Sequence, residues 1–175
     1  MKAMVDDAAP VPAEADADAA AAPEPAVIRR PQALDQSGLT HLMGYAATLA
    51  SVELKKSFRK HLGPLKIKAV EFSIMTLVDT NPEVNQKLLG EAIDVSPPNL
   101  AVTLDRMVER GWVRRERSER DRRAQLVKLT PEGQTLIRKA RRIADTMEHD
   151  ALKVLSPAEQ AMLRELLMRV ARRPG

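Results

Sequence analysis

The sequence predicts a mainly α-helical fold with one small β-hairpin. Hydrophobic residues make up 44% of the chain and aromatic residues only 2%, so the core must be built from aliphatic side chains, which favours helices. Apolar residues recur at three- and four-residue steps along most of residues 39–173. This period is interrupted only around residues 112–130, where two short segments flank a charged loop, a pattern typical of a hairpin.

Residues 1–35 are rich in Ala, Pro and acidic residues and contain almost no large apolar side chain. We expect this segment to be disordered, because it cannot bury enough surface to offset the entropy of ordering. Residues 1–27 hold six acids and one base, a net charge of −5, whereas residues 28–175 hold 27 bases and 18 acids, a net of +9. A basic body favours a polyanionic partner, although a merely solvated basic surface is the alternative.

Three helices are predicted first. One begins at Leu39 and ends at Gly63-Pro64, so it covers 39–62. A second spans about 68–80 and stops at Asn81-Pro82, and a short third spans about 85–93.

The fourth helix has the clearest beginning. Ser96 is a good N-cap, and Pro97 suits the first helical position, where a missing N–H costs nothing. Its buried stripe is predicted to contain Leu100, Leu104, Met107 and Val108, and Gly111 supplies a left-handed stop.

Strands are predicted at 112–117 and 125–130, around a polar loop at 118–123. Thr130-Pro131 then caps a long helix expected to run to about Leu155, and Ser156 with Glu159 forms a capping box that opens a last helix at 157–172. A helix-turn-helix followed at once by a basic hairpin is a winged helix-turn-helix, so residues 65–130 are predicted to bind DNA.

Within this domain, the N-terminal tip and outer face of the fourth helix are the predicted DNA-recognition surface. A helix N-terminus suits a phosphate, Asn99 suits adenine, and Ala101 and Val102 suit thymine methyl groups. The residues predicted to contact DNA are Ser96, Pro97, Pro98, Asn99, Ala101, Val102, Arg106, Arg120, Arg122 and Arg123.

Eight arginines lie between Arg106 and Arg123, with only four acids among them. Arginines on a protruding hairpin suit a narrow, electronegative minor groove, whereas a solvated face more often balances Lys with Glu. Asp121 is predicted to shape the wing by holding Arg123 or Arg115 rather than to contact DNA.

The stretch Ser96–Gly111, the Asp121-Arg122-Arg123 sequence and Leu129-Thr130-Pro131-Glu132-Gly133 together resemble the MarR family of bacterial regulators over about residues 39–173. The resemblance implies a winged-helix dimer that binds palindromic DNA, usually as a repressor, and is released by a small aromatic or phenolic acid or its thioester. Thr103 stands where the family usually has an apolar core residue, and Asp94 where the turn often has Gly. We expect the turn to survive, because Asp tolerates the left-handed region.

The helices at 39–62 and 131–173 exceed what one winged domain needs, so we predict that they form a homodimer; the alternative is a self-contained helical monomer. If an effector pocket adjoins these helices, as in the family, its candidate residues are His41, Tyr45, Arg59 and His61, each of which is equally interpretable as a packing or surface residue.

Other classes of function find little support. The chain has no cysteine, which excludes disulfides and thiol chemistry, and its seven glycines form no phosphate-binding loop. The three histidines lack metal-ligand spacing, so no metal or other cofactor is predicted. No apolar run is long enough to span a membrane, and a cytoplasmic, non-enzymatic protein is expected. A helical adaptor that binds proteins is the alternative function, but it leaves the arginine hairpin unexplained.

Overall fold

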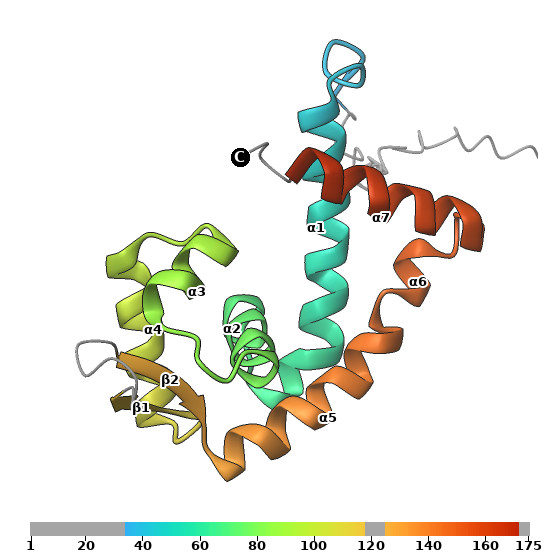
Figure 1. The fold of residues 1–175 in the computed structure, drawn as a ribbon. Coiled ribbons are helices and arrows are strands. Elements are labelled where there is room, and N and C mark those ends of the chain that lie inside the picture. The colour runs from blue at the N-terminus through green and yellow to red at the C-terminus, as the bar shows by residue number, and fades with distance from the viewer. Residues whose placement is uncertain (1–33, 118–124, 172–175) are drawn as a thin grey trace, which may run out of the picture. The chain divides into compact units, whose positions relative to one another are not determined.

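The computed structural model describes residues 34–117 and 125–171. Within the described residues, four α-helices and one 3-10 helix precede the β-hairpin, and three α-helices follow it (Figure 1). The elements are α1 (Met43–Leu62), the 3-10 helix η1 (Gly63–Leu65), α2 (Ala69–Thr80), α3 (Gln86–Ile93), α4 (Pro97–Glu109), β1 (Val113–Arg117), β2 (Gln125–Leu129), α5 (Pro131–Met147), α6 (His149–Leu152) and α7 (Pro157–Ala171).

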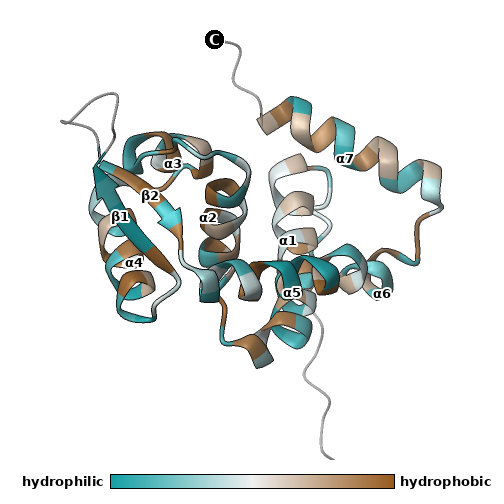
Figure 2. Cartoon of the chain, turned by 60° about the horizontal axis from the view of Figure 1, so that its bottom comes forward, coloured by the Kyte–Doolittle hydropathy of each residue, from teal (hydrophilic) through white to brown (hydrophobic). Residues whose placement is uncertain are grey.

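One hydrophobic core joins the end of α1 to α2, α3, α4, the hairpin and the first half of α5. Leu62, Ile74, Leu100 and Ile137 are fully buried in it. These residues stand on the apolar stripes that the helical period predicts, and the brown inward faces of α2, α4 and α5 in Figure 2 follow the same pattern. The core therefore holds α4, the β-hairpin and the start of α5 together as one unit.

The two strands pair antiparallel, with Val113 opposite Leu129 and Arg117 opposite Gln125. The segment before α3 adds a short third pairing, because Asn85 bridges Leu126 and the Val127 N–H donates to the Val84 carbonyl at 3.0 Å. The sequence did not predict this pairing, which anchors β2 on the beginning of α3.

Three predicted helix starts are confirmed by their hydrogen bonds. The Asn85 side chain accepts from the Leu88 N–H at 3.0 Å, and the Thr130 hydroxyl accepts from the Gly133 N–H at 3.0 Å. At α7, the Ser156 N–H donates to Glu159 Oε2 at 2.7 Å, while the Glu159 N–H donates to Ser156 Oγ at 3.3 Å, which completes the capping box.

The prediction of one helix from 131 to about Leu155 is wrong. The α5 helix ends at Met147, and α6 restarts at His149 after Glu148. The Ser57 hydroxyl of α1 donates to the Met147 carbonyl, which is thereby turned to a partner outside its own helix. Val154, expected on the buried stripe, is 83% exposed.

The last helix, α7, buries none of its described side chains within the chain. Several of its large apolar residues are more than one third exposed: Met162, Leu163, Leu166, Leu167, Met168 and Val170. No helix in the described ranges is both long enough and apolar enough to cross a membrane.

Candidate nucleic-acid interface

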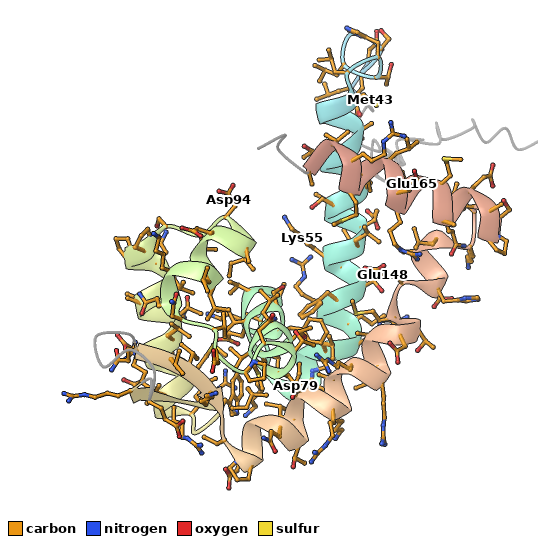
Figure 3. All side chains as sticks on the ribbon, viewed as in Figure 1. Met43, Lys55, Asp79, Asp94, Glu148 and Glu165 are labelled. Carbon is orange, nitrogen blue, oxygen red and sulfur yellow. The ribbon has the colours of Figure 1, made fainter. Side chains whose placement is uncertain are left out.

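A tight turn joins α3 to α4, the predicted recognition helix. Asp94 adopts the left-handed conformation with φ 52°, which confirms that Asp can replace Gly here, and Figure 3 shows its side chain directed outward. The Val95 N–H donates to the Gly90 carbonyl at 3.1 Å. A Cβ at Gly90 would lie 3.1 Å from the Val95 carbonyl oxygen, so the close approach of turn and helix leaves little room for a side chain there.

The N-terminal tip of α4 is open to solvent. Ser96, Pro97, Pro98 and Asn99 are exposed, and Ser96 stands at the N-cap position without making a side-chain capping bond. The expected capping bond is therefore absent. Because Pro97 and Pro98 carry no backbone N–H, the donors that the start of α4 offers to an anion are the Ser96 hydroxyl and the Asn99 N–H.

Further along α4, the residues predicted to face outward differ in their exposure to solvent. Val102 is 58% exposed and Asp105 is exposed, whereas Ala101 and Arg106 are half-buried. The Arg106 guanidinium reaches Thr103 Oγ1 at 3.4 Å, and its Nε is buried without a hydrogen-bond partner among the described residues.

The inward face of α4 differs from prediction at two positions. Val108, predicted to be buried, is 38% exposed, because the burial stripe runs through Leu100, Thr103, Leu104 and Met107 instead. Thr103 is accommodated by donating its hydroxyl proton to the Asn99 carbonyl one turn earlier at 2.9 Å.

The wing begins beside this helix (Figure 1), and its strand β1 carries Arg114, Arg115 and Arg117. Arg114 pairs with Glu116 at 2.6 Å, and Arg115 pairs with Asp105 of α4 at 2.7 Å. Arg117 is exposed and forms no ion pair with any described residue. The predicted tip residues Arg120, Asp121, Arg122 and Arg123 lie outside the described residues.

Two contacts at this interface were missed by the sequence analysis. Asp105 ties the outward face of α4 to β1, and Arg110 at the C-cap of α4 lies 3.6 Å from Glu71, a buried acid of α2. The only sequence signal for Glu71 is an acid on the apolar stripe of the second helix, and that pattern does not identify its partner.

Comparisons with known proteins agree with this geometry. A model described as the MarR family matches residues 67–124. The transcriptional regulator HosA of Escherichia coli O127:H6 is 29% identical over 123 residues, covering 67% of this chain and 91% of HosA. The multiple antibiotic resistance protein MarR of Salmonella typhimurium is 26% identical over 129 residues, covering 73% of this chain and 90% of that protein.

Solved structures align over most of the chain. The transcriptional repressor CouR bound to a 23-mer DNA duplex superimposes with a TM-score of 0.74 at 28% identity, covering 80% of this chain and 99% of CouR. A mutant MarR from E. coli complexed with operator DNA gives 0.68 at 26% identity, covering 74% of this chain and 93% of that one. The chain belongs to the MarR family. As a MarR-family protein it is a DNA-binding transcriptional regulator and not an enzyme.

The four effector candidates of this MarR-family chain fall into two separate pairs. His41 is exposed just before α1 and Tyr45 is half-buried in its first turn, whereas Arg59 and His61 lie in its last turn. The 20 residues of α1 span about 30 Å, so the structure does not bring the pairs together within one chain. The His61 Nδ1 lies 2.9 Å from the Ser57 carbonyl oxygen, in keeping with a packing role.

Proposed function

We propose that this regulator is a cytoplasmic homodimer that represses transcription from a palindromic operator and is released by a small aromatic or phenolic acid, or by its thioester. Residues 65–130 are the DNA-binding domain in this proposal, and 39–62 with 131–173 form the dimerisation region. The observation that carries it is the open N-terminal tip of α4, with its uncapped Ser96 and exposed Asn99, beside a strand of arginines.

In this proposal the tip of α4 enters the major groove. The Ser96 hydroxyl, the Asn99 N–H and the positive end of the helix dipole bind a phosphate, the Asn99 side chain contacts a base, and Val102 contacts a thymine methyl. The wing arginines, among them Arg122, lie along the adjacent minor groove. The related CouR and MarR structures were solved with DNA, which supports duplex DNA as the partner.

Dimerisation is supported by the apolar side chains that α7 leaves uncovered. Burying a Leu such as Leu163 or Leu166 fully is worth about 1.5–3 kcal/mol, so an uncovered row of them favours a second copy. Exposed Leu49 and Val52 on α1, with exposed Leu42 at its N-cap, extend the apolar surface available to the partner. Two copies then place their α4 helices about 34–36 Å apart, one turn of duplex.

The proposed effector class is supported by CouR, which was solved bound to p-coumaroyl-CoA. An anionic ligand needs a base, and Arg59 is exposed without an ion pair to any described residue. His41, Tyr45 and His61 complete the candidate set. Adding p-coumaric acid or p-coumaroyl-CoA to the DNA complex is expected to release the protein, and Arg59→Ala is expected to blunt that release.

In the central experiment, the wild-type protein is used to select duplexes from a randomised pool. The most enriched duplex is then titrated with protein in gel shifts. We expect a palindrome, with affinity falling steeply as salt rises because counterions are released. Arg122→Ala should weaken binding to every duplex, whereas Asn99→Ala should selectively reduce preference for the selected one. Equal affinity for selected and scrambled duplexes contradicts the proposal, and complete absence of DNA binding would favour a protein-binding adaptor.

A further inference from the structure

The junction between the recognition helix α4 and the wing contains a buried carboxylate. Glu71, in the first turn of α2, is 1% exposed, and its Oε2 accepts a hydrogen bond from the Lys68 N–H at 2.8 Å. A carboxylate removed from water is costly unless a cation and donors compensate it. The position of its counter-ion is therefore a strong constraint on the local packing.

That counter-ion is Arg110, and its guanidinium makes three contacts. Arg110 Nη1 lies 3.6 Å from Glu71 Oε2, and Arg110 Nη2 donates to the Lys66 carbonyl at 2.9 Å. The guanidinium carbon also lies 3.5 Å from the centroid of the Trp112 ring, which is a cation–π contact. A planar cation with several fixed donors suits this combination, and Lys cannot reproduce it.

These contacts join segments that belong to different parts of the fold. Lys66 and Lys68 lie in the strap, residues 66–68, which links η1 to α2, and Lys66 holds the left-handed conformation with φ 56°. Arg110 is the C-cap of α4, and Trp112 directly precedes β1.

The Trp112 backbone is fixed from both sides. Its N–H donates to the Met107 carbonyl at 2.9 Å, and its carbonyl accepts from the Thr130 N–H at 3.1 Å. Arg110 therefore acts on a junction that is already tied to α4 and to the residue that caps α5.

We propose that Arg110 is a positioning residue for DNA recognition, which fixes the end of α4 and the base of the wing on the strap that follows the α1 helix. The inference rests on the proposed function, operator recognition by α4 and the wing. It separates Arg110 from the arginines that contact DNA, because its guanidinium is directed at Glu71, Lys66 and Trp112. Arg117, by contrast, is exposed and forms no ion pair with a described residue.

The test uses the full chain and two duplexes, the one that the wild type selects from a randomised pool and a scrambled version of it. The variants are Arg110→Ala, Arg110→Lys and Glu71→Gln. Arg142→Ala is the matched control, because Arg142 is an exposed arginine of α5 without an ion pair among the described residues. Trp112 is the single tryptophan of the chain, so its emission reports on the junction directly.

For Arg110→Ala we expect about a tenfold loss of affinity for the selected duplex and little change for the scrambled one. The slope of log affinity against log salt should stay that of the wild type, and Trp112 emission should shift to longer wavelength. Arg110→Lys should fall between the wild type and the alanine variant, and Arg142→Ala should change neither the ratio of affinities nor the emission. Glu71→Gln, which keeps an acceptor for the Lys68 N–H, should lower the same ratio.

If the slope of log affinity against log salt decreases in magnitude by about one in Arg110→Ala, Arg110 contacts a phosphate and the inference is overturned. An unchanged ratio of affinities despite a shifted Trp112 emission would overturn it as well. If Arg110→Ala lacks a cooperative thermal transition, the Glu71→Gln variant provides the test instead. An unchanged ratio of affinities for the selected and scrambled duplexes in folded Glu71→Gln refutes the positioning role of Arg110. If the wild type enriches no duplex, the proposed function fails and the inference with it, whereas losses confined to the variants concern Arg110 alone.

Discussion

Gly133 allows α5 to begin directly against the backbone at the base of the wing. A Cβ built at Gly133 would lie 2.0 Å from the Trp112 carbonyl oxygen and 2.9 Å from its carbon, where real contacts stay above 3.0 Å. Gly133→Ala therefore requires backbone to move by about 1 Å within a close-packed junction. This contact gives a physical reason for the glycine in the Leu-Thr-Pro-Glu-Gly motif.

The cost follows from what that movement breaks. The Trp112 carbonyl accepts from the Thr130 N–H, and the Thr130 hydroxyl caps α5 by accepting from the Gly133 N–H. Losing each bond costs about 1 kcal/mol, and overpacking adds about 1–3 kcal/mol. We expect Gly133→Ala to lower the free energy of unfolding by about 3–5 kcal/mol, which lowers Tm by roughly 10 °C.

Urea and thermal unfolding, each at one fixed protein concentration, measure this loss. Gly44→Ala is the matched control, because Gly44 lies in α1 and a Cβ there meets nothing within 4 Å. The control should match the wild type or gain up to about 1 kcal/mol from helix propensity. If Gly133→Ala unfolds within about 1 kcal/mol of the wild type, the reasoning from backbone contact is refuted.

Asp94→Ala should cost about 1 kcal/mol in urea unfolding, because alanine resists the left-handed conformation at φ 52°, while Asp94→Gly should be neutral or stabilising; the reverse order would contradict the role of the turn. Asp105→Asn removes the partner of Arg115 and one negative charge from the DNA-recognition surface, so affinity for a scrambled duplex should rise in gel shifts, and a fall would argue against this orientation. The pKa of the Glu159 carboxyl is lowered, chiefly by the hydrogen bond from the Ser156 hydroxyl and then by the Ser156 N–H, so its contribution to capping α7 is present above its ordinary pKa of 4.5 and is lost as pH falls through the lowered value. Glu159→Gln should flatten the acid dependence of helix content in circular dichroism, and an unaltered acid transition would show that the cap does not contribute.

Local chemistry made most of the helix boundaries predictable. Pro97, Thr130 and Ser156 mark helix starts because caps depend on neighbours within a few residues, and the structure places α4, α5 and α7 at these starts. The exposed tip at Asn99 was predictable for the same reason, since the 3.6-residue period assigns one face to the core.

Contacts between distant segments were not predictable from the sequence. At the end of α5 the Met147 carbonyl accepts from Ser57 of α1, a distant contact, while the apolar period continues past that point. Glu71 reads as an ordinary helix residue until Arg110 is seen beside it. Such pairs need the tertiary fold before they can be recognised, because periodicity describes one element at a time.

Strand β1, which carries the wing arginines, is also an edge strand of its sheet. Within the described residues β2 pairs with β1 and, through Leu126, with Asn85, so β1 has only one paired side. An unpaired strand can template aggregation with other chains, and charged side chains are a common protection against it. The charged residues from Arg114 to Arg117, three arginines and one glutamate, are a protection of this kind when no duplex is bound. In the proposed function, the arginines among them also lie toward DNA, so one set of charges would serve both solubility and binding.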